Sequence, residues 1–420
     1  MKQSENLSNK MSFFPFSGVR GLLLLLIVLF ASCTKQESKD EVITRVFKLA
    51  EVQYNFLIEQ IDTISPLKQP RGMRENDRLF LVNKEDWTSG FFPGSLWYLY
   101  EYSQKPEWKN RAIKYTMALD SAQFITWNHD VGFMIQNSYG NAFRLDSQKT
   151  VYKQAVIDAA KSLITRYRPV AGVIQSWDTG DYMGWIAKRG WDMPVIIDNM
   201  MNLNLLFETT KLTGDSIFYK IALTHANTTI MHHFRPDFSS YHVIDYDHKT
   251  GEVRSKQTAQ GYSHPSSWAR GQAWGLYGFT ECYAETKNEE YLKQAIAIAN
   301  YIIHNPKIPE NGVPYWDYDD PKIPNAPRDA SAAAISASAL LELQQFDTEN
   351  RKIYLEYAEK ILRSLASPDF LAKEKENGGF ILKHSVGNYH TGEELDKPLN
   401  YADYYFLESL LRWSKVTPNP

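Results

Sequence analysis

The sequence predicts an all-α protein in which twelve helices pair as six hairpins and close into an (α/α)6 barrel. Apolar residues recur with helical periodicity in twelve segments. The connections between these segments are rich in Gly, Pro, Asn and Asp, which is typical of loops. No alternation of strands and helices indicates a parallel sheet. A two-domain helical solenoid is the alternative, although no fixed repeat period supports it.

The predicted helices have recognisable beginnings and one unusual member. Asp215, Pro265 and Asp329 stand at or near helix starts. The segment 330–340 is so rich in Ala and Ser that we expect it to line the crowded centre of the ring. An alternating stretch and a Lys-Thr-Gly turn predict a small β-hairpin near 241–256. The predicted helices cover residues 40–61, 93–102, 107–124, 131–143, 150–167, 197–212, 216–234, 266–286, 290–304, 329–346, 351–365 and 401–413.

The first 33 residues have the pattern of an export signal rather than of a folded segment. Lys10 and Arg20 precede the apolar run 21–31, which is short for a membrane span and suits a secretory signal. The run ends at Ala31-Ser32-Cys33, which resembles a bacterial lipoprotein cleavage site. We therefore expect a lipidated Cys33, a tether over 34–40 and a single catalytic domain over 41–420. The protein would then be a periplasmic or cell-surface lipoprotein of a Gram-negative-type bacterium; a true membrane anchor is the alternative.

Composition excludes several classes of function. The net charge of −3 gives no broad positive field for nucleic acid. With Cys33 lipidated, Cys282 is the one remaining thiol, so neither a disulfide nor a Cys-rich metal site can form. Because motifs such as HExxH, the P-loop and GxGxxG are also absent, we expect no metal and no cofactor. The 11 Trp and 25 Tyr include candidates for sugar-binding platforms as well as core residues.

Asp198 is the leading candidate for a catalytic acid. It lies in the run 194–207, which is apolar except for this carboxylate and three amides. A buried carboxylate is costly unless it is paired or protonated, and its raised pKa suits a general acid working near neutral pH. Asp130, in Trp127-Asn128-His129-Asp130-Val131-Gly132, is the candidate partner. Paired carboxylates in unequal environments separate acid and base roles in glycosidases. Helix capping is the alternative for both residues.

Two further segments supply candidate binding residues. In Trp268-Ala269-Arg270-Gly271-Gln272-Ala273-Trp274, the i, i+4 spacing places Arg270 and Trp274 on one helix face, where they could bind a carboxylate and support a sugar ring. A surface cation–π pair is the alternative. The stretch from His242 to Gln260 offers donors for sugar hydroxyls. Trp87 is either a platform or a hydrophobic staple for the helix that follows it.

At these residues the chain resembles the unsaturated glucuronyl hydrolases of glycoside hydrolase family 88. The matching segments run in family order and span most of the chain; they are 87–91, 129–133, 196–203, 268–274 and 400–405. The resemblance implies a six-hairpin α/α barrel. It also implies an enzyme that removes a 4,5-unsaturated uronic acid from the non-reducing end of lyase-generated oligosaccharides, most simply of glycosaminoglycan type. Hydration of the double bond begins that reaction.

The resemblance also implies roles for particular residues. Asp198 matches the proton donor, and Asp130 matches a second essential carboxylate that either orients substrate and water or attacks the anomeric carbon. Matches to carboxylate- or water-positioning residues are Arg270, His242 and Gln260. Matches to the aromatic wall are Trp274, Trp87 and Tyr401.

The wall also includes a Trp shortly before the acid. Trp177 fits that position, but 180–191 looks like extra sequence, so Trp185 or Trp191 could take the role. Two rival functions stay open. One is an unsaturated rhamnogalacturonyl hydrolase of the same fold, disfavoured because that family tends to have Asn-Gly at positions 272 and 273. The other is a surface lipoprotein that binds glycans without catalysis. The polysaccharide and its sulfation are not specified by the sequence.

Overall fold

The computed structural model describes residues 36–180, 184–392 and 394–417. The expected signal segment and Cys33 lie outside the described residues. The chain divides into two units, Met1–Glu37 and Ser38–Pro420, and the fold given below is that of the second. Among the described residues, no helix is both long enough and apolar enough to span a bilayer.

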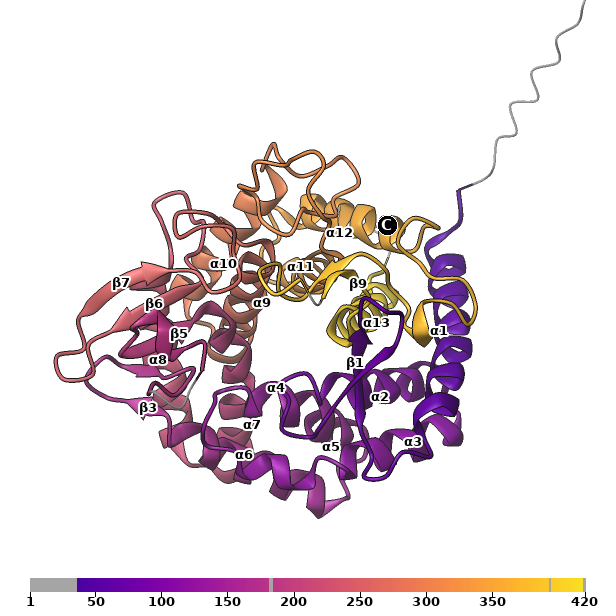
Figure 1. The fold of residues 1–420 in the computed structure, drawn as a ribbon, viewed down its shortest axis with the longest axis horizontal. Helices are drawn as coiled ribbons and strands as arrows, with labels where there is room; N and C mark the ends of the chain where they lie inside the picture. The colour runs from indigo at the N-terminus through magenta and orange to yellow at the C-terminus, as the bar shows by residue number, and fades with distance from the viewer. Residues whose placement is uncertain (1–35, 181–183, 393, 418–420) are drawn as a thin grey trace, which may run out of the picture. The chain divides into compact units, whose positions relative to one another are not determined.

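In the described part of the chain, helices alternate between an outer and an inner layer. The outer layer contains α1 (Lys39–Ile61), α3 (Pro106–Met117), α6 (Thr150–Ile164), α8 (Ser216–His233), α10 (Glu289–Ile303) and α12 (Arg351–Leu365). The inner layer contains α2 (Phe91–Ser103), α4 (Val131–Ile135) continued by α5 (Asn141–Leu145), α7 (Leu203–Thr213), α9 (Ala269–Thr286), α11 (Ala330–Leu343) and α13 (Asn400–Ser414). Successive inner helices contact one another, and α13 contacts α2, which closes the ring (Figure 1). The predicted six-hairpin barrel is confirmed.

The contrast between α11 and α12 shows how sequence assigns a helix to its layer. Helix α11 is buried on nearly every side, as expected for a helix that is apolar or small all round. Helix α12 buries only one face, at Tyr354, Tyr357, Ala358, Ile361, Leu362 and Leu365. That spacing of three and four residues is the stripe of an outer helix packed on an inner ring.

Small antiparallel sheets decorate the ring. The predicted hairpin is present as β6 (Val243–Tyr246) and β7 (Val253–Gln257), but β5 (Met193–Ile196) extends it to a three-stranded sheet in the order β5-β6-β7. The short pairs are β1 (Gln69–Met73) with β2 (Leu79–Val82), β3 (Tyr167–Arg168) with β4 (Val173–Ile174), and β8 (Ser385–Val386) with β9 (Leu395–Lys397). Strand β5 was not expected, because a short apolar run has no period that separates strand from helix.

Three predicted helices are divided or begin differently in the structure. The segment 107–124 divides into α3 and a 3₁₀ helix, Asp120–Phe124. The segment 131–143 contains a π-helical turn, Gln136–Gly140, between α4 and α5. The segment 197–212 begins with the 3₁₀ helix Ile197–Asn202 before α7. The last difference matters for function, because it places Asp198 in a tight turn between a strand and a helix.

Candidate active site

The predicted site residues meet at one end of the ring. Asp130 is the N-cap residue of α4, and Asp198 lies in the turn that leads into α7. Arg270 and Tyr401 are each the second residue of their helices, α9 and α13. The N-terminal ends of four inner helices therefore converge. His242, the residue directly before strand β6, lies with them.

Asp198 is a buried carboxyl group without a hydrogen-bond partner on one oxygen. The residue is 8% exposed, and its Oδ2 makes no hydrogen bond to any described residue. Burial raises its pKa to about 7, against the opposing charge of Arg270. The N-cap of its 3₁₀ helix is Ile196, so the capping alternative for Asp198 is wrong. The group can therefore hold a proton near neutral pH, and its Oδ2 is still able to form a hydrogen bond.

Asp130 shares this environment. Although it stands at the N-cap of α4, its side chain makes no capping hydrogen bond. Its Oδ1 lies 3.3 Å from Nε2 of His129, whose own pKa burial lowers to about 3. Burial first, and then the negative charges of Asp198 and Asp86, raise the pKa of Asp130 well above its usual value. Asp198 is thus close enough to oppose the ionisation of Asp130.

His242 is fixed in one tautomer by its neighbours. Its Nδ1 accepts hydrogen bonds from the backbone N–H groups of Ala259 and Gln260, each at 3.1 Å. A nitrogen that accepts carries no proton, so the neutral ring is protonated at Nε2. That Nε2 lies 3.6 Å from Oδ2 of Asp198. Burial lowers the pKa of His242 well below 6.5, so the ring is a neutral donor aimed at the acid.

Arg270 is held by the protein itself. Its guanidinium is 1% exposed and donates to Oδ2 of Asp329 at 3.0 Å and to the carbonyls of Val386 and Gly387. It lies 4.5 Å from the ring centroid of Trp268 and 5.2 Å from that of Tyr401. The surface cation–π alternative with Trp274 is therefore wrong. The charge of Arg270 acts on Asp198 from within the wall, where only its Nε lacks a partner.

Aromatic rings form the walls around the two acids. The half-buried Trp87 packs at 5.1 Å on Tyr401 and at 5.6 Å on Phe133. It also contacts Phe91 at 5.9 Å. The N-cap of α2 is Gly90, so a hydrophobic staple would join Ser89 to Gly94, and the staple interpretation of Trp87 is wrong. Trp274 packs at 5.3 Å on Phe133. Its buried indole N–H makes no hydrogen bond of ordinary length among the described residues, yet it lies near enough to Asp198 to oppose the rise in the pKa of that carboxyl. The wall residues expected from the sequence thus lie together.

The three candidate tryptophans, Trp177, Trp185 and Trp191, form one cluster. Trp177 stacks on Trp191 at 5.8 Å and meets the ring of His242 edge-on at 6.4 Å. Trp185 is 51% exposed and packs on the outer side, at 5.3 Å from Trp177. Trp177 is therefore the ring that packs against His242. The remaining predicted residue, Gln260, is half-buried and reaches the carbonyl of Gly387 at 3.4 Å.

An ion-pair clamp beside Trp87 was not predicted from the sequence. Arg71 pairs with Glu394 through Nε at 2.6 Å and Nη2 at 2.7 Å, and with Asp86 at 3.0 Å. Its guanidinium lies 5.8 Å from the Trp87 ring. Arg71 and Glu394 are distant along the chain and belong to short hairpins that have no strong periodicity. Asp86, adjacent to Trp87, was the one available indication.

Comparison with known proteins agrees with this geometry. The family model Glycosyl Hydrolase Family 88 matches residues 58–416. The chain belongs to Glycosyl Hydrolase Family 88. An unsaturated glucuronyl hydrolase of Formosa agariphila is 44% identical over 392 residues, which cover 93% of this chain and 95% of the relative. An unsaturated chondroitin disaccharide hydrolase of Streptococcus pneumoniae is 31% identical, over 90% of this chain and 93% of the relative.

A solved structure shows the same fold. The crystal structure of an unsaturated glucuronyl hydrolase specific for heparin is 42% identical and superposes with a TM-score of 0.84, over 90% of this chain and 98% of that one. The predictions of the family, of the barrel and of a glycosidase are confirmed. The roles predicted for individual residues, and lipidation at Cys33, stay predictions.

Proposed function

We propose that this unsaturated glucuronyl hydrolase removes the terminal 4,5-unsaturated uronic acid from lyase-generated oligosaccharides of glycosaminoglycan type. The catalytic part of this proposal is supported mainly by the environment of the Asp198 carboxyl. Its carboxyl is buried, burial raises its pKa to about 7, and one of its oxygens makes no hydrogen bond among the described residues. A vinyl ether is protonated on carbon by such an acid.

The proposed reaction begins with transfer of the Asp198 proton to C4 of the unsaturated ring. The C4=C5 electron pair forms the new C–H bond, and positive charge develops at C5 and the ring oxygen. Water then adds at C5, and the proton that the water releases restores the acid form of the carboxyl pair. The resulting hemiketal collapses and frees the remainder of the oligosaccharide.

The residues around Asp198 stabilise the negative charge that its carboxyl gains when it gives up its proton in this reaction. After proton transfer the carboxylate faces the Nε2–H of His242 and the positive charge of Arg270. Donors placed where charge develops stabilise the transition state. We assign Asp130 the task of orienting substrate and water, because its carboxyl makes no capping bond and lies within electrostatic reach of Asp198. The alternative role for Asp130 is that of a nucleophile that attacks the anomeric carbon.

The substrate class is supported by the relatives, whose names refer to chondroitin disaccharides and to heparin. The test is a panel of unsaturated disaccharides prepared with chondroitin, hyaluronan and heparin lyases, with and without sulfate. Turnover is followed as loss of the ultraviolet absorbance of the C4=C5 double bond. Binding without loss of absorbance on every member would contradict an enzymatic function on this class and would favour the glycan-binding alternative.

We also propose that the protein is exported and anchored through a lipidated Cys33. The support is the sequence pattern of the first 33 residues. Lys39, at the start of α1, donates to the carbonyl of Val416 at 2.7 Å, beyond the C-terminal end of α13. The folded unit would therefore be tethered at the end of the ring opposite Asp198. Labelling with a tagged fatty acid should mark the wild type and not Cys33→Ser; equal labelling of both would reject this site.

A further inference from the structure

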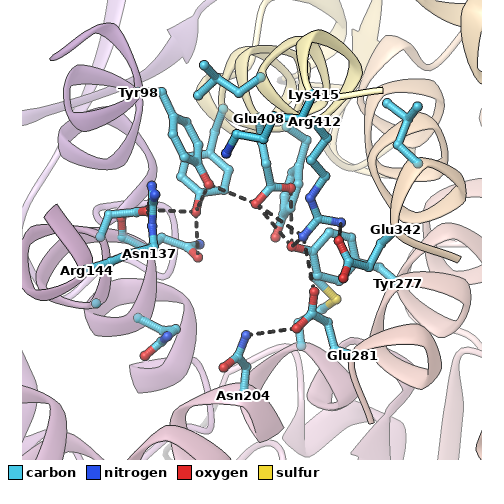
Figure 2. A pocket seen from close by; sticks show the side chains of 18 of the residues that line it. Tyr98, Asn137, Arg144, Asn204, Tyr277, Glu281, Glu342, Glu408, Arg412 and Lys415 are labelled. Atoms are coloured by element: carbon cyan, nitrogen blue, oxygen red, sulfur yellow. Dashed lines mark hydrogen bonds and ion pairs between the residues drawn. The ribbon is translucent and has the colours of Figure 1, made fainter. Parts of the chain in front are cut away.

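A cavity lies at the C-terminal ends of the inner helices, opposite the end that carries Asp198. Its volume is about 830 Å³, which is large enough for one or two sugar rings. Each inner helix segment contributes to its wall, and Figure 2 shows these side chains surrounding the open centre. Examples, one from each segment in order, are Glu101, Arg144, Asn204, Glu281, Glu342 and Arg412.

One wall of this cavity holds more negative than positive charge. Arg412 is surrounded by three carboxylates, with Glu281 at 3.1 Å, Glu342 at 3.6 Å and Glu408 at 3.9 Å. Burial, and then the charges of Glu342 and Glu408, raise the pKa of Glu281 to about 7 against the effect of Arg412. Three carboxylates thus face one guanidinium, and the cluster lacks positive charge.

The helix ends add to this imbalance. Glu281 lies near the C-terminal end of α9 and Glu342 near that of α11, and neither helix has a basic residue in its last turn. The C-terminal end of a helix carries partial negative charge and favours cations. Acidic side chains at these two ends therefore add to the field that already attracts a positive group into the cavity.

Two buried amide side chains that line the cavity each have one polar atom without a hydrogen-bond partner among the described residues. Asn137 is 9% exposed; its Oδ1 accepts from Tyr404, while its Nδ2 has no partner among the described residues. Figure 2 shows Asn137 directed toward the open centre. Gln344 is buried, and its Oε1 likewise has no partner. A buried amide left unpaired is costly, so a donor and an acceptor are available to a ligand that carries hydroxyl groups.

We propose that this cavity is a second ligand site that binds an amino sugar. The ammonium group lies between Glu281 and Glu342, beside Asn204, which already donates to Oε2 of Glu281 at 3.1 Å. The hydroxyl groups pair with Asn137 and Gln344. The tyrosine rings of the wall supply flat apolar contact for the sugar ring. The site does not share its wall residues with the catalytic end, so the inference does not depend on the proposed reaction.

Calorimetric titration of the protein near pH 6.5 tests this site with two matched probes, D-glucosamine and N-acetyl-D-glucosamine. They share the ring, but only the first carries an ammonium group. We expect one equivalent of D-glucosamine to bind, and the neutral sugar to bind at least about ten-fold more weakly, since a hydrogen bond between charged groups contributes about this factor. Glu281→Gln should weaken D-glucosamine about ten-fold. Asp198→Asn, and the surface control Glu290→Gln, should leave the affinity unchanged.

Asn137→Ala provides a second variant that leaves the carboxylate cluster intact, and it should also weaken D-glucosamine. Equal affinity for the two sugars would overturn the assignment of a cationic ligand. Unchanged affinity in both Glu281→Gln and Asn137→Ala, or loss of binding in Asp198→Asn alone, would place the ligand elsewhere and overturn the site. Absence of D-glucosamine binding to the wild type would overturn the proposal outright.

Discussion

Replacing Asp198 with Asn should abolish turnover and stabilise the fold above neutral pH. The carboxyl has a pKa of about 7 in the folded protein, against an ordinary value of 3.8. Between these values the folded chain holds a proton that the unfolded chain has released. Because the folded state binds more protons, stability falls as the pH rises through this window. Each pH unit corresponds to about 1.4 kcal/mol, so ionisation of Asp198 costs the wild type up to about 4 kcal/mol by pH 8.

An amide of the same shape cannot ionise, and it therefore escapes this cost. We expect denaturant unfolding near pH 8 to show Asp198→Asn more stable than wild type by up to about 4 kcal/mol, and near pH 4 to show little difference. The control Asp369→Asn changes an exposed carboxylate and should do neither. Turnover on an unsaturated disaccharide should fall by about 10²–10⁴-fold, the contribution of a positioned acid. A variant less stable than wild type at both pH values would show that Asp198 does not carry a raised pKa, and one retaining full turnover would remove Asp198 from the proton transfer.

Three further substitutions follow from the geometry. Arg270→Ala leaves Asp329 buried without its ionic partner, so we expect denaturant unfolding to show a loss of stability of about 3–5 kcal/mol. Unchanged stability with a change confined to KM would show instead that the arginine mainly binds substrate. Trp177→Ala should lower kcat/KM more than Trp185→Ala, because only Trp177 packs on His242; the reverse order in steady-state kinetics would assign the wall to the outer ring. Gly132→Ala places a methyl group 2.2 Å from Oδ1 of Asn202, so we expect a loss of stability of about 1–3 kcal/mol and a lower melting temperature. A melting temperature equal to that of wild type would show that the contact relaxes freely.

The fold could be predicted because its main determinant is periodic. Helices α11 and α12 show their layers in their own residues, one small and apolar all round, the other striped. Strand β5 could not be predicted in the same way, because Val195 and Ile196 are as compatible with a buried helix as with a strand. Its pairing partner, β6, lies far along the chain, and the sheet depends on tertiary contacts that no local pattern encodes.

The site was predictable where chemistry is unusual in its surroundings. Asp198 in an apolar run and Asp130 beside His129 are exceptions to local expectation, and both lie at the same end of the ring. The partners of Arg270 were not predictable: its pairing with Asp329 and with the carbonyls of Val386 and Gly387 depends on how α9, α11 and β8 meet. The tautomer of His242 depends in the same way on the backbone of a loop 17 residues away.

The proposed reaction requires that the buried carboxyl of Asp198 keep its proton near neutral pH. Carbon-13 NMR titration of the protein labelled at its aspartate carboxyls measures this directly, with the Asp198→Asn spectrum identifying the resonance. We predict that the resonance missing from the variant titrates with an apparent pKa of about 7. A midpoint near the ordinary value of 3.8 would contradict the account, since the carboxyl would then have no proton to give.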